Sequence, residues 1–243
     1  MPKSERTAID PQEAFTIALM MQFQKQRELL HIAPNADDLS KLDDQHPISI
    51  PAKSKLAQTE WLKLVQTTKP HTTQVRSMAQ DDVLRLLELI RTQCLLRETE
   101  MQAITSAWIW SLLARVQDVG TMGNDSVSLI REFGKKAILV QLSFHEPDAA
   151  KQLEHAADEE DLGNRGSLSA TNASVVFATK AEGATTDQDA NSINSENDTA
   201  STQNTLATLD MIIAVVGEVF GQRDLLEFRQ PWSESTVSHD HDT

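Results

Sequence analysis

The sequence predicts an all-α fold: a single bundle of about six helices, interrupted by one long disordered acidic loop. Two observations lead to this prediction. Apolar residues recur at helical spacing in several stretches of the 243-residue chain, and Pro, Gly and Asp residues separate these stretches. Between residues 146 and 204 the composition changes to acidic and small polar residues, which offer few apolar groups to offset the entropy of ordering.

The first helix is expected to begin at Asp10, which can cap free amides, and Pro11, which suits the first turn. Glu13 follows three residues after the cap, as in a capping box. Up to about His31, apolar residues then recur at helical spacing, at Phe15, Leu19, Phe23 and Leu30.

Two helices are expected on either side of Pro70. A connector rich in Pro and Asp (34–51) leads into a short helix (56–65) that carries Trp61, and Pro70 ends it. The next helix, over 81–94, contains the segment VLRLLELI. Its apolar stripe is interrupted by charged residues, so one of its faces is buried and the other meets water.

The fourth helix is expected to lie at the centre of the bundle. Thr99 and Gln102 have the spacing of a capping box ahead of it. From Met101 to Val116, which includes the segment WIWSLLARV, the only charged residue is Arg115. A helix that is apolar almost all round belongs in the middle of a bundle.

Two further helices, over 125–144 and 206–220, flank the acidic loop and are expected to pack against each other. Gly134 inside the first costs about 1 kcal/mol relative to Ala, unless close packing requires the missing side chain. The loop holds twelve acidic and three basic residues, and its length costs little because loop-closure entropy grows slowly. The chain thus divides into a disordered N-terminus, the first part of the bundle, a disordered insertion, the final helix and a disordered tail, over 1–9, 10–145, 146–204, 205–228 and 229–243.

Composition and motifs argue against several classes of protein. The net charge of −14 disfavours direct binding to nucleic acid, which needs clustered Lys and Arg. The single cysteine, Cys94, excludes an internal disulfide and is interpreted as a small buried filler. We expect a soluble intracellular protein, because no secretory segment is seen and the apolar stretch Met211 to Val216 is too short to span a membrane. Catalytic motifs are absent from the sequence, so neither catalysis, a cofactor nor a metal is expected.

Trp108 and Trp110 cannot share one face of the fourth helix. Residues two apart lie about 200° apart around an α-helix. If Trp108 points into the bundle, Trp110 must therefore meet another helix or a partner protein, and exposed Trp side chains are common binding anchors. The sequence leaves both possibilities open for Trp110.

Four segments in this order resemble the survival motor neuron (SMN) interacting protein family, to which the second gemin of the SMN complex belongs. They are VLRLLELI, WIWSLLARV, SLIREFGKK and VFGQRDLLE, and the resemblance covers roughly Leu56 to Leu226 without the insertion. The residues that match the family's motifs are Trp108, Trp110, Leu112, Leu113, Ala114, Ser128, Leu129, Ile130, Arg131, Phe220, Gln222, Arg223, Asp224 and Leu225.

The resemblance implies a helical adaptor without catalysis that works in the assembly of spliceosomal small nuclear ribonucleoproteins, in cytoplasm and nucleus. Such an adaptor holds an amphipathic helix from the N-terminal part of SMN in a groove and contacts the paired D-type Sm proteins. The residues expected to bind partners are Trp108, Trp110, Leu113, Arg115, Leu129, Arg131, Phe220 and Arg223.

Departures from the family and competing interpretations bear on these expectations. Only nine residues precede the first expected helix, whereas vertebrate-type members carry a long N-terminal arm, so the arm's function is not expected here or the chain is a fragment. Ala107 stands where a basic residue would suit an acidic partner helix. Arg223 and Asp224 are more readily interpreted as an internal pair that ends a helix. The rivals are a generic helical scaffold and a small helical enzyme that uses Glu88 or Asp210 as acid or base.

Overall fold

The computed structural model describes residues 10–40, 42–43, 45–153 and 191–232, with side chains from residue 199 onward in the last stretch. Across these residues the chain is helical and forms no β-strand, which confirms the all-α prediction. In chain order the elements are α1 (Pro11–His31), α2 (Ala36–Leu39), α3 (Lys55–Thr67), α4 (Thr72–Ser77), α5 (Gln80–Gln93), α6 (Ala103–Arg115), the 3₁₀ turn η1 (Val119–Thr121), α7 (Asn124–His145), α9 (Asn191–Glu218) and the 3₁₀ turn η2 (Arg223–Phe228).

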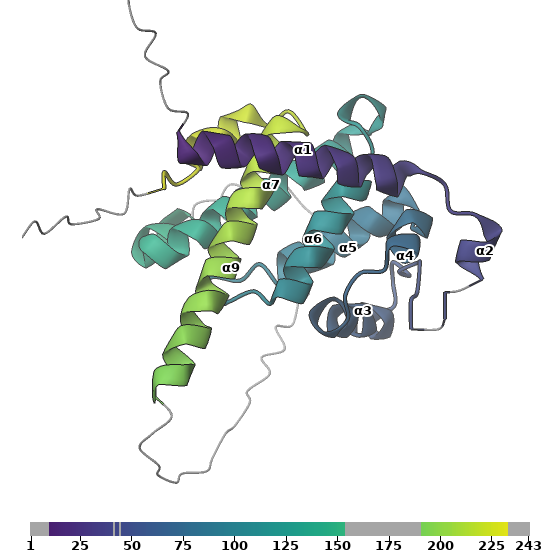
Figure 1. Cartoon of the computed structure of the whole chain (residues 1–243), viewed down its shortest axis with the longest axis horizontal. Coiled ribbons are helices and arrows are strands. Elements are labelled where there is room, and N and C mark those ends of the chain that lie inside the picture. Colours follow the sequence, from purple (N-terminus) through teal and green to yellow (C-terminus); the bar gives the residue numbers. More distant parts are fainter. Residues whose placement is uncertain (1–9, 41, 44, 154–190, 233–243) are drawn as a thin grey trace, which may run out of the picture.

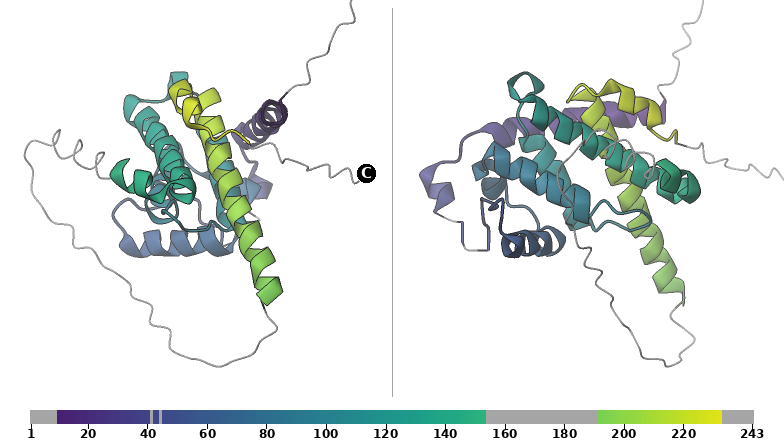
Figure 2. Two further views of the ribbon diagram at one scale, coloured as in Figure 1. Left: turned by 90° about the vertical axis from the view of Figure 1, so that its left-hand side faces the viewer. Right: turned by 180° about the vertical axis from the view of Figure 1, so that it is seen from behind.

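Helix α6 lies at the centre of the bundle, as its sequence predicts. It packs against α1, α3, α5 and α9, and α1 lies across its outer side (Figures 1 and 2). More than half of its residues are buried because apolar side chains occur on nearly every face. Helix α1 also contacts α4 and α9, so it joins both ends of the bundle.

Helices α7 and α9 pack against each other more extensively than any other described pair, which confirms that the helices flanking the insertion are neighbours. Glycine makes this approach possible. A Cβ atom on Gly134 would lie 2.8 Å from Leu225 Cδ1 and 2.9 Å from Val216 Cγ1, and one on Gly217 would overlap Leu226. The missing side chain at Gly134 is therefore required by packing, and η2 closes over the space that the two glycines leave.

The last helix begins much earlier than the sequence predicts, at Asn191 instead of Leu206. Short polar residues with low helix propensity fill this part of α9, which is why composition alone suggests a loop. Tertiary hydrogen bonds hold its last polar turns in place: the Met101 amide donates to Thr205 Oγ1 at 2.7 Å, and Asn204 Nδ2 donates to the Met101 carbonyl at 2.7 Å. Residues 147–153, also assigned to the insertion, are helical.

Other expectations about local structure fail or fall outside the described residues. The capping box at Thr99 is wrong, because α6 begins after Gln102 and the Thr99 hydroxyl donates to the Arg97 carbonyl instead. Asp10 precedes α1 but makes no side-chain cap. The short helices α2 and α4 were missed because four to six residues show no period. The expectations for 1–9, 154–190 and 233–243 lie outside the described residues.

Candidate partner-binding surface

The two tryptophans of α6 point to opposite sides, as their spacing requires. Trp108 is fully buried, donates its indole N–H to the Thr68 carbonyl at 2.7 Å and meets Trp61 of α3 edge-on, with ring centroids 5.9 Å apart. Trp110 is partly exposed and meets Phe23 of α1 edge-on, with ring centroids 5.1 Å apart. Trp110 therefore meets another helix, and its remaining exposed edge lies along the junction of α1 and α6.

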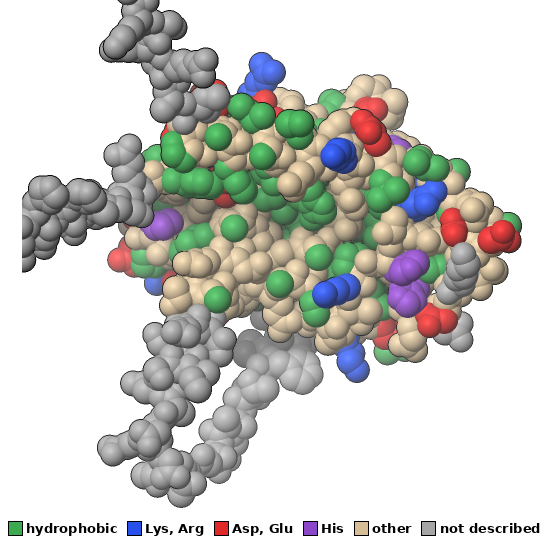
Figure 3. Space-filling view, viewed as in Figure 1, with side chains coloured by type: hydrophobic (Ala, Val, Ile, Leu, Met, Phe, Trp, Pro, Cys, Tyr) green, Lys and Arg blue, Asp and Glu red, His purple; other side chains and the backbone are tan. Residues whose placement is uncertain are grey.

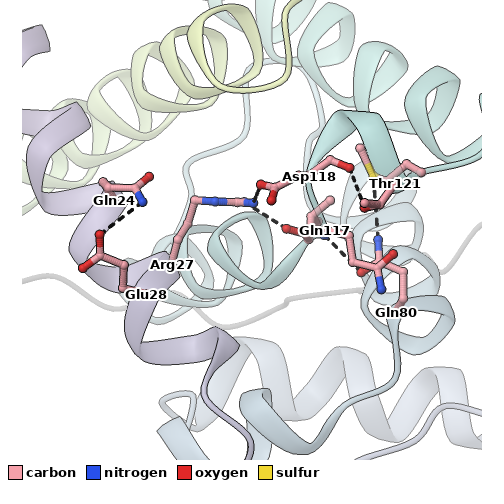
Figure 4. Close-up of polar contacts among 9 residues, drawn as sticks. Gln24, Arg27, Glu28, Gln80, Gln117, Asp118 and Thr121 are labelled. Carbon is pink, nitrogen blue, oxygen red and sulfur yellow. Dashed lines mark hydrogen bonds and ion pairs between the residues drawn. The ribbon is translucent and has the colours of Figure 1, made fainter.

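A buried arginine on α1 ties that helix to the rest of the bundle. Arg27 is 6% exposed, donates to the Val116 carbonyl at 2.9 Å and pairs with Asp118 at 2.6 Å. Its guanidinium carbon also lies 5.7 Å from the centroid of the Phe220 ring. Figure 4 shows the Arg27 side chain reaching from α1 to the loop after α6.

The same loop is fixed to α5 and by a turn of its own. The Gln117 amide donates to Gln80 Oε1 at 3.2 Å, and the Thr121 hydroxyl donates to the Asp118 carbonyl at 2.8 Å (Figure 4). Asp118 is thus held where it can receive the Arg27 guanidinium, although its own side chain remains largely in water. The sequence analysis does not identify Arg27 as a buried residue. The signal was its position four residues after Phe23 and three before Leu30, on the apolar stripe of α1.

Arg115 at the end of α6 has no carboxylate partner within the described part of the chain. One of its Nη atoms donates to the Met78 carbonyl at 3.1 Å, while its Nε is buried without a hydrogen-bond partner. Burial lowers the pKa of Arg115 because the protonated form loses solvation. Burial, followed by the charges of Arg27 and Arg115, also lowers the pKa of His31. The guanidinium of Arg115 is therefore a positive charge at this end of α1 and α6. Arg76 donates to the Ile32 and Ala33 carbonyls just after α1.

A second cluster joins α7 to η2. Arg131 donates to Gln222 Oε1 at 2.6 Å and binds both carboxylate oxygens of Asp224, at 2.9 and 2.5 Å. This bond lowers the pKa of Asp224 below its ordinary value, because it stabilises the carboxylate. The expectation that Asp224 pairs with Arg223 is wrong: Arg223 is exposed and, as far as the structure describes the chain, has no hydrogen-bond or ion-pair partner.

The eight residues that the sequence proposes for partner binding therefore occupy different environments. Trp108, Leu113 and Phe220 are in the core, so they shape the surface from beneath and do not reach it. Leu129 is partly buried against the core. Three of the eight side chains are at least partly exposed and could bind a partner: Trp110, Arg115 and Arg223. Arg131 already forms an ion pair with Asp224.

The carboxylates that an enzyme would use are bound to arginines. Glu88 accepts two hydrogen bonds from Arg91, each of 2.7 Å, and Asp210 binds Arg229 through both oxygens at 2.8 and 2.7 Å. No cluster of three or more metal-ligating side chains occurs in the described ranges, and none of the helices described there is long and apolar enough to cross a membrane. Burial raises the pKa of the Cys94 thiol to about 11, so it is protonated at neutral pH.

Comparison with known proteins supplies one match. The family model described as Survival motor neuron (SMN) interacting protein 1 covers residues 1–223. It thus includes the helices that the structure describes from α1 to α9, and it ends at the first residue of η2. Neither the curated proteins nor the solved structures contain a match to this chain.

Proposed function

We propose a function from one premise: the chain belongs to the Survival motor neuron (SMN) interacting protein 1 family. We infer that it is the counterpart of the second gemin, an adaptor without catalysis that binds SMN and a pair of D-type Sm proteins. In this role it assists assembly of spliceosomal small nuclear ribonucleoproteins in cytoplasm and nucleus. The observation that carries the proposal is the family match across nearly the whole described bundle.

The exposed edge between α1 and α6 is the best place for the amphipathic SMN helix. Trp110 offers a partly exposed aromatic side chain there, of the kind that anchors helices in grooves. Arg115 carries a charge that no described carboxylate neutralises, and one of its nitrogens is buried without a partner. An acidic side chain on the incoming helix would pair with the part of this guanidinium that reaches solvent and fix the helix in register.

Arg223 suits a different contact, because it lies on η2 next to the ion pair of Arg131 and Asp224. Its guanidinium is exposed and binds no carboxylate among the described residues, so it could bind an acidic group of a partner. We assign Arg223 to the contact with the D-type Sm pair. Arg131 then holds η2 against α7 and makes at most a peripheral contact with the partner.

A binding titration tests the SMN assignment. The full chain is titrated with the N-terminal segment of its own organism's SMN protein, beside the variants Trp110→Ala and Arg115→Gln. We expect saturable binding that each substitution weakens about tenfold or more, which corresponds to at least about 1.4 kcal/mol. Circular dichroism confirms that each variant is folded.

Arg223→Ala serves as the matched control in that titration and as the test variant with the purified D-type Sm pair. It should leave SMN binding unchanged and weaken Sm binding. If the folded wild-type chain binds neither partner, the adaptor function is wrong and a helical scaffold with other partners remains. If SMN binds but Trp110→Ala has no effect, the groove lies elsewhere.

A further inference from the structure

Helix α1 carries an apolar stripe on the side that faces away from the bundle. Its inner side is defined by the buried residues Phe23, Arg27 and Leu30. On the outer side four exposed residues follow the spacing i, i+3, i+4, i+7, so they form one continuous row: Ala14, Ile17, Ala18 and Met21. Ile17 is 50% exposed and Met21 66% exposed, although nothing in their own helix requires apolar side chains there.

The C-terminal segment enlarges this apolar surface. Trp232 packs against Phe15 with ring centroids 5.0 Å apart, yet both rings stay partly in water. Gln12 holds the segment in place, since its Nε2 donates to the Gln230 carbonyl at 3.0 Å and its Oε1 accepts from the Trp232 amide at 3.3 Å. Figure 3 shows hydrophobic side chains gathered along the side of the molecule where α1 lies.

An acidic hollow borders the first turns of the same helix. Asp10, Glu13 and Glu218 line it together with the apolar residues Leu226 and Pro231. These three carboxylates are exposed and have no ion-pair partner among the residues placed by the structure. The one cation that lines the hollow, Arg229, is bound through two nitrogens to Asp210 and so does not neutralise them.

We propose that this outer surface of α1, which we call the outer stripe (Ala14, Ile17, Ala18 and Met21), docks an amphipathic helix of a basic partner protein. A row of side chains at helical spacing fits the grooves of another helix, and the two alanines allow close approach. The unpaired acids at one end of the stripe complement Lys or Arg on the incoming helix.

The charges decide between this partner and two other occupants. The acidic hollow repels an anionic lipid surface, and a second copy of this chain brings the same net charge of −14. The surface also differs from the one assigned to SMN, because acidic side chains border the start of α1 whereas Arg115 lies near its end. The inference therefore goes beyond the proposed function and does not depend on it.

A titration with a designed probe tests the proposal. The probe is a fluorescently labelled amphipathic peptide of two Leu-Lys-Lys-Leu-Leu-Lys-Leu repeats, and the matched probe carries Glu in place of every Lys. Fluorescence anisotropy follows binding to the full chain. We expect the basic probe to bind the chain and the acidic probe to bind at least tenfold more weakly.

Two pairs of variants locate the contact. Ile17→Ser with Met21→Ser should weaken binding about tenfold, whereas Leu56→Ser, at an exposed apolar position of α3, should not. The double variant Glu13→Gln with Glu218→Gln should weaken binding of the basic probe and reduce the salt dependence of binding. Its control, Glu60→Gln with Asp81→Asn, removes the same charge elsewhere and should change neither. The proposal falls if the stripe variant binds like the wild type, if both probes bind equally, or if sedimentation shows dimers that the stripe variant abolishes. Since SMN binding uses other residues, its loss or retention does not alter these outcomes.

Discussion

The two sides of the bundle are held together by different means. On one side, α7, α9 and η2 meet through glycines, so that backbone and branched side chains approach closely. On the other side, α1 lies over α6, where it buries Phe23 and Leu30. It is fixed further by a buried arginine, one edge-on aromatic pair and a glutamine that binds the C-terminal segment. Separating close-packed helices leaves voids that cost free energy, whereas polar groups that separate can form hydrogen bonds with a partner or with water instead.

This difference suits an adaptor. The α7–α9 side acts as a rigid frame, because any change in volume there forces the helices apart. The α1 side carries the partly exposed Trp110 and the outer stripe, so the partner helices proposed for these two surfaces would bind outside the frame. The contact proposed for Arg223 would instead use the surface of the frame at η2. We therefore expect substitutions between α7 and α9 to unfold the protein, and substitutions under α1 to loosen that helix first.

The largest expected effect comes from filling a glycine on the close-packed side. Gly134→Val should lower the free energy of unfolding by about 3 kcal/mol, because its side chain would overlap Leu225 and Val216. Urea denaturation followed by circular dichroism measures this change. Gly120→Val is the matched control, since an added Cβ there meets no described atom within 4 Å. Equal stability of the two variants would show that α7 and α9 do not pack as closely as described.

Replacing the buried arginine of α1 should destabilise the protein less than Gly134→Val does, and the loss of stability should be concentrated in α1. Arg27→Met keeps the apolar stem against Phe220 but removes the hydrogen bonds to the Val116 carbonyl and Asp118, at a cost of about 2 kcal/mol. Hydrogen exchange should become faster in α1 while α7 and α9 stay protected. Lys25→Met, an exposed change on the same helix, is the control. Faster exchange spread evenly over the bundle would remove the distinction between its two sides.

The sequence predicts those features that depend on spacing along one helix, on both sides of the bundle. Apolar periodicity and end signals locate α1, α5 and α7 within one residue, and the spacing of Trp108 and Trp110 correctly requires that they face opposite ways. Gly134 in an otherwise good helix also indicates close approach before any contact is known. These signals are local, because they depend on spacing along one helix.

What the sequence misses depends on partners far away in the chain. Arg27 looks like a solvent-exposed charge until Val116, Asp118 and Phe220 surround it. The polar turns of α9 before Thr205 resemble a disordered loop because their stabilising hydrogen bonds come from the segment around Met101. The same limit applies to Asp224, whose partner is Arg131 on another helix and not its neighbour Arg223.

The smallest expected effect concerns pH and the bond between Arg131 and Asp224, which joins the frame at its surface. Arg131 lowers the pKa of Asp224 below its ordinary 3.8, so the folded state binds this proton less readily than the unfolded state. The bond therefore contributes stability above about pH 4, and this contribution is lost as the pH falls through the lowered pKa. Wild type should be slightly more stable than Asp224→Asn at pH 6, and the difference should shrink as the pH falls below about 4, as urea denaturation at each pH would measure. Glu227→Gln, whose carboxylate has no ion-pair partner among the described residues, should track the wild type throughout. A gap between wild type and Asp224→Asn that stays constant with pH would mean that η2 is held to α7 by the packing of Leu225 and Leu226 alone.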